Sequence, residues 1–135
     1  MISAKIPNSI RKGIYRRDGY ACALCGDPRA LAIHHVIPRS AGGGNSPYNL
    51  ICLCRYCHGN VHGLHLSELY IDPEEVGQAC TEYVSDLYAG EWSPFAKLDY
   101  EDPTEFKFAQ YLIQKAIDFL SGRNPKWAGT TYDWR

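Results

Sequence analysis

The sequence contains no long apolar run, no internal repeat and no low-complexity segment. A membrane-spanning helix needs about 18 consecutive apolar residues, and no stretch approaches that length. The first residues lack the apolar core of a secretory signal, so we expect a cytoplasmic protein without a membrane partner. With 45% hydrophobic and 21% charged residues among 135, the composition is typical of a folded globular protein and excludes a disordered chain.

Acidic residues are scarce in the first half of the chain. Residues 1–62 carry eight Lys and Arg but only two acidic residues, whereas residues 63–135 carry six basic and thirteen acidic residues. The overall net charge of −1 hides this asymmetry. A polyanion is therefore expected to meet the first half alone. We expect the acidic half to complete a hydrophobic core, with contact to a protein partner as a second expectation.

Histidine is absent after His65, and Cys80 is the one cysteine beyond residue 57. Clustering of both residue types in a chain without a secretory signal indicates metal binding before disulfides. The next histidines upstream, His58 and His62, are four residues apart, so on a helix their side chains form a two-nitrogen metal platform. An ordinary surface or core pair is the alternative interpretation.

Two short cysteine pairs, Cys22-x-x-Cys25 and Cys54-x-x-Cys57, are separated by 28 residues. Two such knuckles predict one tetrahedral four-cysteine site for structural Zn²⁺. A single pair would have left a redox role open. Cys52 is interpreted as a buried small residue, as is Cys80, and the alternative is that Cys52 replaces Cys54 as a ligand.

The order of secondary structure follows from capping and breaking residues. A short basic helix is expected from about residue 8 to 17, and two strands with a long loop between them should form a hairpin. Asp-Pro dipeptides predict the starts of two later helices, which Gly90 and Gly122 are expected to end. The aromatic tail after residue 122 is expected to dock onto the core or a partner. The expected strands are 31–37 and 50–53, and the expected helices are 8–17, 57–65, 73–89 and 103–121.

The histidines and one asparagine resemble a known motif. His34-His35 is followed by Asn49 after thirteen residues, by His58 after eight more, and by His62 after another three. Together with the upstream cysteine pair and the Pro-Arg-Ser-x-Gly-Gly loop, this order resembles the HNH endonuclease family. The resemblance covers roughly residues 10–65.

The resemblance implies a ββα-metal core around one catalytic divalent ion. By analogy His35 is the general base, and His34, His58 and His62 are ligands of that ion. Asn49 is expected to brace the loop and orient the base; in some relatives this residue helps to bind the metal. The chemistry agrees, because a neutral imidazole can accept a proton at neutral pH and a divalent ion can neutralise charge on phosphate.

The expected class is α+β, with an HNH core and four-cysteine zinc site at 1–66 and an acidic helical extension at 67–135 packed on it. We expect an endonuclease that nicks DNA with low sequence specificity. Three imidazoles suit Mn²⁺, Co²⁺ or Ni²⁺ better than Mg²⁺. The alternatives are a non-catalytic zinc module that binds nucleic acid or protein, and a ribonuclease. The arginines expected at the nucleic acid are Arg39, Arg55, Arg16 and Arg17.

Overall fold

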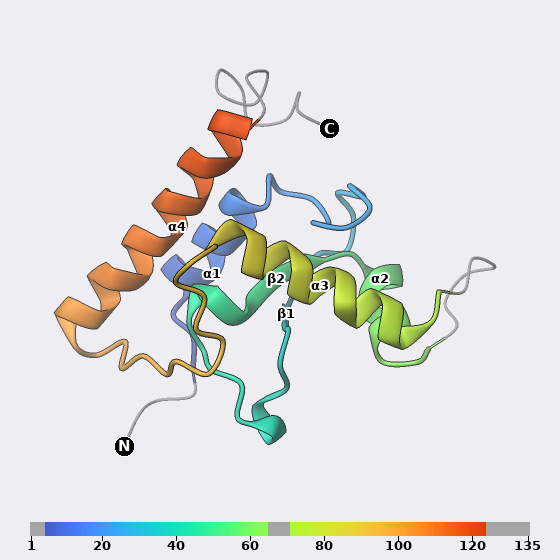
Figure 1. Cartoon of the computed structure of the whole chain (residues 1–135), viewed down its shortest axis with the longest axis horizontal. Coiled ribbons are helices and arrows are strands. Elements are labelled where there is room, and N and C mark those ends of the chain that lie inside the picture. The colour runs from blue at the N-terminus through green and yellow to red at the C-terminus, as the bar shows by residue number, and fades with distance from the viewer. Residues whose placement is uncertain (1–4, 65–70, 124–135) are drawn as a thin grey trace.

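The computed structural model describes residues 5–64 and 71–123. Its α+β architecture consists of one two-stranded sheet and four α-helices, which confirms the expected fold class. Short 3-10 turns at Arg39–Ala41 and Pro47–Asn49 interrupt the loop of the hairpin. The elements in chain order are α1 (Asn8–Arg17), β1 (Ala32–His35), β2 (Leu50–Leu53), α2 (Arg55–Val61), α3 (Pro73–Leu87) and α4 (Pro103–Arg123) (Figure 1).

The two strands form an antiparallel hairpin in which Ala32 pairs with Leu53 and His35 pairs with Leu50. The second strand lies where the sequence predicted it, whereas β1 is shorter than the expected 31–37. After His35 the backbone leaves the ladder, because the amide of Ile37 donates to the side chain of Asn49 over 2.8 Å. A side chain therefore takes the place of a strand partner at this end of the hairpin.

Helix α2 begins two residues earlier than expected and ends four residues earlier. Cys54 is the N-cap, and its sulfur accepts a hydrogen bond from the amide of Cys57 over 3.5 Å. At the other end Gly63 adopts a φ of 78°, a left-handed conformation that glycine tolerates and that ends a helix. The start of α2 is thus determined by Cys54, one of the predicted zinc ligands. Its end is determined by Gly63, the residue after His62.

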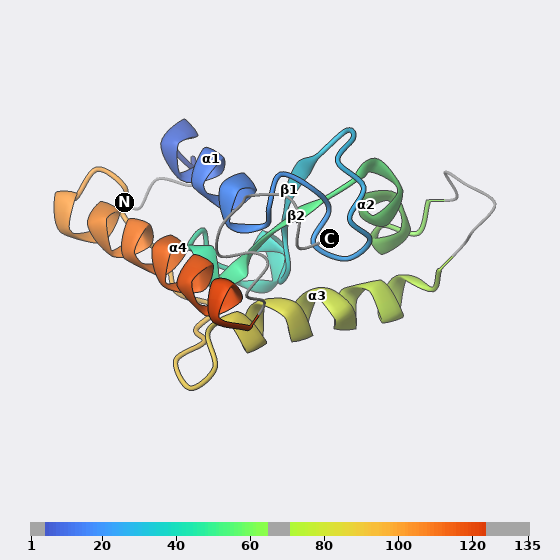
Figure 2. The same ribbon diagram turned by 90° about the horizontal axis from the view of Figure 1, so that it is seen from above.

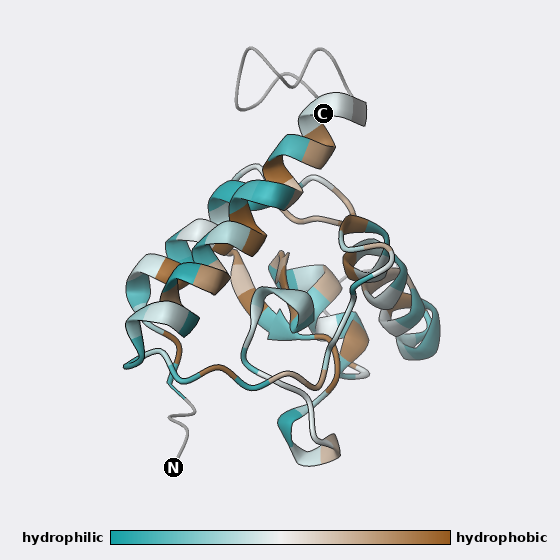
Figure 3. Cartoon of the chain, turned by 60° about the vertical axis from the view of Figure 1, so that its left-hand side comes forward, coloured by the Kyte–Doolittle hydropathy of each residue, from teal (hydrophilic) through white to brown (hydrophobic). Residues whose placement is uncertain are grey.

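Helices α3 and α4 cover the hairpin with their apolar faces. Asp72 caps α3 by accepting a hydrogen bond from the amide of Glu74 over 2.8 Å. Gly122 lies within α4 and does not end it, contrary to the sequence expectation. Figure 3 shows the hydrophobic residues of both helices gathered on the sides that face the hairpin, and Figure 2 shows the hairpin enclosed between α1, α3 and α4. Buried residues on α3 are Val76, Cys80, Val84 and Leu87.

Helix α1 packs directly on α4. A Cβ atom built on Gly13 would lie 2.6 Å from Cδ1 of Ile113, so the absence of a side chain lets the two helices approach closely. Ile10 and Ile14 fill the space beneath this contact together with Ile113. The first and last helices of the described chain therefore share one hydrophobic cluster, although residues 18–102 lie between them in the sequence.

Arg17 is fully buried, which contradicts its assignment as a nucleic-acid contact. Its guanidinium forms a bidentate ion pair with Asp18, at 2.8 and 2.9 Å, and also donates to the carbonyls of Pro47 and Leu50. Because every partner is inside the protein, this side chain cannot reach a ligand. The sequence already indicated the burial of Arg17, because residues 10, 14 and 17 lie on one face of the helix and the first two are isoleucines.

The long loop of the hairpin is closed by the segment that connects α3 to α4. The side chain of Asn45 donates to the carbonyl of Leu98 over 2.9 Å and accepts from its amide over 2.7 Å. A Cβ atom on Gly43 or Gly44 would lie 1.8–1.9 Å from the carbonyl oxygens of Ile37 or Ala96. The consecutive glycines are therefore required, since the backbone of two other segments occupies the space of a side chain.

The acidic part of the chain contacts the first part at several places. In addition to the α1–α4 contact, α3 lies against α2 and β2. The division into two domains at residue 66 remains a prediction. The aromatic tail, with Trp127, Tyr132 and Trp134, lies outside the described residues. Among residues 5–64 and 71–123, no helix combines the length and apolar character that crossing a membrane requires.

We predict that Asp18→Ala destabilises the protein by about 3–5 kcal/mol, because it leaves the buried guanidinium of Arg17 without its counterion. Urea unfolding of the metal-loaded protein measures this change. Arg29→Ala is the control, since it breaks an exposed ion pair with Asp27. Equal stability of Asp18→Ala and the wild type would contradict the assigned importance of the buried pair.

Candidate metal centres and active site

The four predicted cysteines come together at one point. Cys22 and Cys25 lie on the knuckle before β1, and Cys54 and Cys57 lie at the start of α2. Their sulfur atoms all lie within 4.8 Å of one another, and the sulfurs of Cys25 and Cys54 are 3.5 Å apart. Four thiolates bound to one Zn²⁺ at about 2.3 Å have sulfurs about 3.8 Å apart, so this cluster fits a tetrahedral ion.

The electrostatics of these sulfurs also fit a cation. Partial desolvation, then the neighbouring thiols of Cys54 and Cys22, raise the pKa of Cys25 to about 11. A hydrogen bond from the thiol of Cys57, with further hydrogen bonds from backbone amides, lowers the pKa of Cys22 to about 4, so the protein stabilises this thiolate but not that of Cys25. Four thiolates can therefore share this space only if a positive ion balances their charge. Cys52 and Cys80 are buried outside the cluster, and burial raises the pKa of Cys80 to about 12. Both are neutral thiols that fill space, as the sequence indicated.

Three histidines form a second cluster, carried by β1 and α2. His34 projects from β1, His58 from α2, and His62 is the C-cap of α2. Their ligand nitrogens lie within 4.8 Å of one another, and the Nε2 atoms of His58 and His62 are 3.2 Å apart. Nitrogens that share one ion at about 2.1 Å lie about 3.4 Å apart, so only small side-chain shifts would bring the three to a common ion.

Two of the three imidazoles, those of His34 and His58, have lowered pKa values that favour the neutral form. Burial, together with the neighbouring His58 and His62, lowers the pKa of His34 to about 4. Burial and His62 also lower the pKa of His58. A protonated imidazole cannot bind a cation, so these shifts keep the nitrogen lone pairs available at neutral pH.

His35 occupies the opposite side of β1 from His34, but both border the same small cavity. The cavity has a volume of about 240 Å³ and is lined by the three-histidine cluster, His35, Arg39, Pro38 and Ile33. Burial, followed by the charges of Arg39 and Arg11, lowers the pKa of His35. Its Nε2 atom is buried and has no hydrogen-bond partner among the described residues. His35 is therefore a neutral imidazole with unused hydrogen-bonding capacity beside the cluster.

Asn49 is completely buried behind this cavity. Its Oδ1 accepts from the amide of Ile37, while its Nδ2 donates to the carbonyls of Ile37 and Gly44 over 3.0 and 2.9 Å. The side chain thus joins the end of β1 to the glycine loop. Because both ends of the amide point into the protein, the side chain is placed to brace the loop and not to meet a ligand.

The four arginines selected from the sequence lie in different environments. Arg39 lines the histidine cavity, and Arg55 is exposed at the start of α2. Arg16 is exposed on α1 and donates to Gln114 over 3.1 Å. Arg17 is buried, as described above. The residue that sequence reasoning left out of the site is Arg11, whose charge acts on His35; its position beside the buried face of α1 was the available signal.

Residues 22–63, under a third of the chain, match the family model described as HNH endonuclease, which confirms the resemblance drawn from the residues. The match includes both cysteine pairs and every histidine of the cavity. Searches of curated proteins and of solved structures found no significant match.

We predict that the purified protein carries one zinc ion per chain at the four cysteines. Cys54→Ala should reduce the zinc content to near zero, because three thiolates and the lost helix cap bind the ion far more weakly. Cys52→Ala is the matched control and should retain the metal. Elemental analysis after dialysis measures both, and loss of zinc in Cys52→Ala alone would contradict the ligand assignment.

We predict that Asn49→Asp destabilises the protein by about 2–4 kcal/mol, because carboxylate oxygens would face the carbonyls of Ile37 and Gly44. Asn8→Asp, the same change on an exposed residue of α1, should have little effect. Thermal unfolding compares the two variants. Equal melting temperatures would show that the buried amide does not brace the loop.

Proposed function

We propose that this protein is a metal-dependent endonuclease that hydrolyses phosphodiester bonds in DNA by nicking one strand with low sequence specificity. One observation carries the proposal: three imidazoles whose nitrogens are close enough to share a metal ion, and a separate imidazole, His35, border a single cavity. Three metal ligands without a neighbouring proton acceptor would be sufficient for a purely structural metal site. A fourth imidazole with an unpartnered buried nitrogen adds the capacity to accept a proton.

The proposed roles follow from position. His35 takes the proton of a water molecule whose oxygen forms a new bond to phosphorus. The bond from phosphorus to the leaving oxygen breaks, and that oxygen takes a proton from solvent. Arg39 lines the same cavity and is proposed to hold a phosphate oxygen. Asn49 is proposed to act as a positioning residue, because its three hydrogen bonds hold the loop that follows His35.

His34, His58 and His62 are proposed to hold the catalytic divalent ion. When bound, such an ion neutralises charge that develops on the phosphate and the leaving oxygen. An all-imidazole set favours Mn²⁺, Co²⁺ or Ni²⁺ over Mg²⁺, which prefers oxygen ligands. The separate four-cysteine cluster is proposed to hold structural Zn²⁺, and its thiols are consistent with a cytoplasmic, reducing environment.

Two other functions are tested by the same assay. A ribonuclease would use the same groups, because neither imidazoles nor a metal selects the sugar. A non-catalytic zinc module would bind nucleic acid or protein without cutting. The unpartnered nitrogen of His35 favours the enzyme over the module, since a binding surface has no need of a buried proton acceptor.

We predict that the protein converts supercoiled plasmid to the open-circular form with Mn²⁺, Co²⁺ or Ni²⁺. His35→Ala should lower the nicking rate by at least about 100-fold, because a general base contributes roughly that factor or more. Agarose gels read the products over time, and His35→Ala must retain its zinc and its melting temperature for the comparison to count.

The controls separate the alternatives. Activity with Mg²⁺ alone would contradict the three-histidine ligand set. Cleavage of single-stranded RNA with intact plasmid would indicate a ribonuclease. No cleavage with any metal, or equal rates for wild type and His35→Ala, would overturn the endonuclease proposal.

A further inference from the structure

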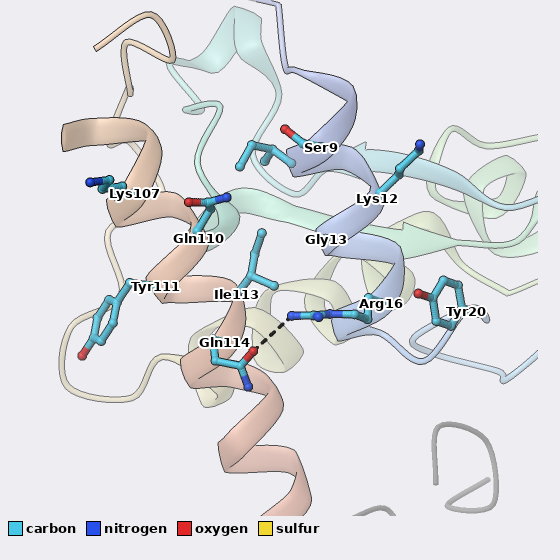
Figure 4. Close-up of a pocket in the computed structure, with 11 residues that line it drawn as sticks. Ser9, Lys12, Gly13, Arg16, Tyr20, Lys107, Gln110, Tyr111, Ile113 and Gln114 are labelled. Atoms are coloured by element: carbon cyan, nitrogen blue, oxygen red, sulfur yellow. Dashed lines mark hydrogen bonds between the residues drawn. The ribbon is translucent and has the colours of Figure 1, made fainter. Parts of the chain in front are cut away.

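A second and larger concavity lies between α1 and α4, outside the histidine cavity. Its volume is about 760 Å³, and eleven residues line it, all from α1, α4 and Tyr20 just after α1 (Figure 4). We call it the α1–α4 groove. Its α4 wall lies beyond residues 22–63, so the family match says nothing about it.

The floor of the α1–α4 groove is rigid. Gly13 and Ile113 meet there at the close contact of the two helices, and Ile10 lies buried beside them. Packed helices of this kind hold their side chains at fixed spacing. The groove is therefore a permanent feature of the fold and not a gap between loosely placed elements.

The rim of the groove is positively charged. Lys12 and Arg16 stand on α1, and Lys107 stands on α4. Both lysines and Arg16 are exposed. None of the described residues that line the groove carries a carboxylate, although residues 63–135 contain thirteen. The wall that α4 contributes to the groove is therefore basic and carries amide groups, although residues 63–135 have a net negative charge.

Hydrogen-bond donors and acceptors accompany these charges. Arg16 reaches across the groove to Oε1 of Gln114, so the two helices fix its guanidinium at one end (Figure 4). Gln114 in turn donates to Asp118, which lies one helical turn further along α4 and outside the lining. Lys107 and Gln110 lie toward the other end, and their amine and amide groups suit phosphate oxygens.

Helix α1 connects the groove to the strand that borders the histidine cavity. Helix α1, whose Lys12 lines the groove, also contacts β1, the strand that carries His34 and His35. Arg11 and Lys12 differ by one helical step of about 100°, so they occupy adjoining sides of α1. Helix α1 therefore carries basic side chains both on the side that faces the groove and on the adjoining side.

We propose that the α1–α4 groove binds the phosphate backbone of DNA, with Lys12, Arg16 and Lys107 contacting a stretch of strand that flanks the phosphodiester at the histidine cavity. This inference rests on the proposed nuclease function for its choice of ligand. It assigns substrate binding to α4, although the charge distribution of the sequence predicted that only the first half of the chain contacts a polyanion. Such contacts bind without reading bases, in keeping with low sequence specificity.

The test is DNA affinity without cleavage. In a His35→Ala background, Lys107→Ala and Lys12→Ala are compared with Lys115→Ala by fluorescence anisotropy of a labelled 30-base-pair duplex. Lys115 is the matched control, because it lies on the same helix but outside the groove and pairs with Glu91. All three changes remove one positive charge.

We expect Lys107→Ala and Lys12→Ala each to weaken binding roughly 3–10-fold at low salt and to reduce the slope of log K against log salt by about one, whereas Lys115→Ala leaves both unchanged. Equal affinities for Lys107→Ala and Lys115→Ala would overturn the proposal. Selective loss in Lys107→Ala supports the groove even if the wild type fails to nick plasmid, so the two proposals fail separately.

A second measurement avoids mutation. Acetylation of lysines in the folded protein, read by mass spectrometry with and without duplex DNA, should show Lys12 and Lys107 protected and Lys115 unchanged. Protection of Lys115 alone, or of no lysine under conditions where anisotropy shows binding, would place the DNA elsewhere. If an added protein protected Lys12 and Lys107 from acetylation and DNA did not, the groove would be a protein interface.

Discussion

The carboxylate of Asp18 is the point on which the arrangement of the elements depends. It forms the ion pair with Arg17, accepts from the amide of Cys52 over 2.9 Å, and accepts from the hydroxyl of Tyr83 over 2.7 Å. One side chain at the end of α1 is thereby joined to β2 and α3. Since a buried charge is tolerated only with such partners, the three elements have one low-energy arrangement.

From this fixed hairpin, α2 connects the two metal-binding clusters. Cys54 ends β2 and caps the helix, Cys57 belongs to the cysteine cluster, and the next residue, His58, belongs to the histidine cluster. A tetrahedral ion at the cysteines would hold the first turn of a helix that is only seven residues long. The orientation of His58 and His62 is set by that turn, so the cysteine cluster positions groups that it does not contact.

Sequence reasoning worked where the cause was local. Paired cysteines, Asp-Pro helix starts, and alternation of His34 and His35 across a strand are all short-range patterns, and the helices and clusters they predicted are present. It was less accurate where the partner is distant. Arg17 resembles a solvated cation until its acceptors, the carbonyls of Pro47 and Leu50, are folded against it. The early end of β1 likewise depends on Asn49, fourteen positions after His35.

Net charge is the clearest case of a pattern that sequence sums cannot resolve. The acidic residues of the second half include the caps of two helices, Asp72 and Asp102, and the partner of Lys115, so many serve local hydrogen bonds. A carboxylate used in this way faces its own helix end or a neighbouring amine. The remaining surface is what approaches a ligand. At α4 that surface presents Gln110 and Gln114 toward α1, and Lys107 also lines the groove. At physiological salt, screening limits the interaction between exposed charges to distances of about 10 Å or less. The binding of a charged ligand therefore depends on the groups near it and not on the net charge of the whole chain.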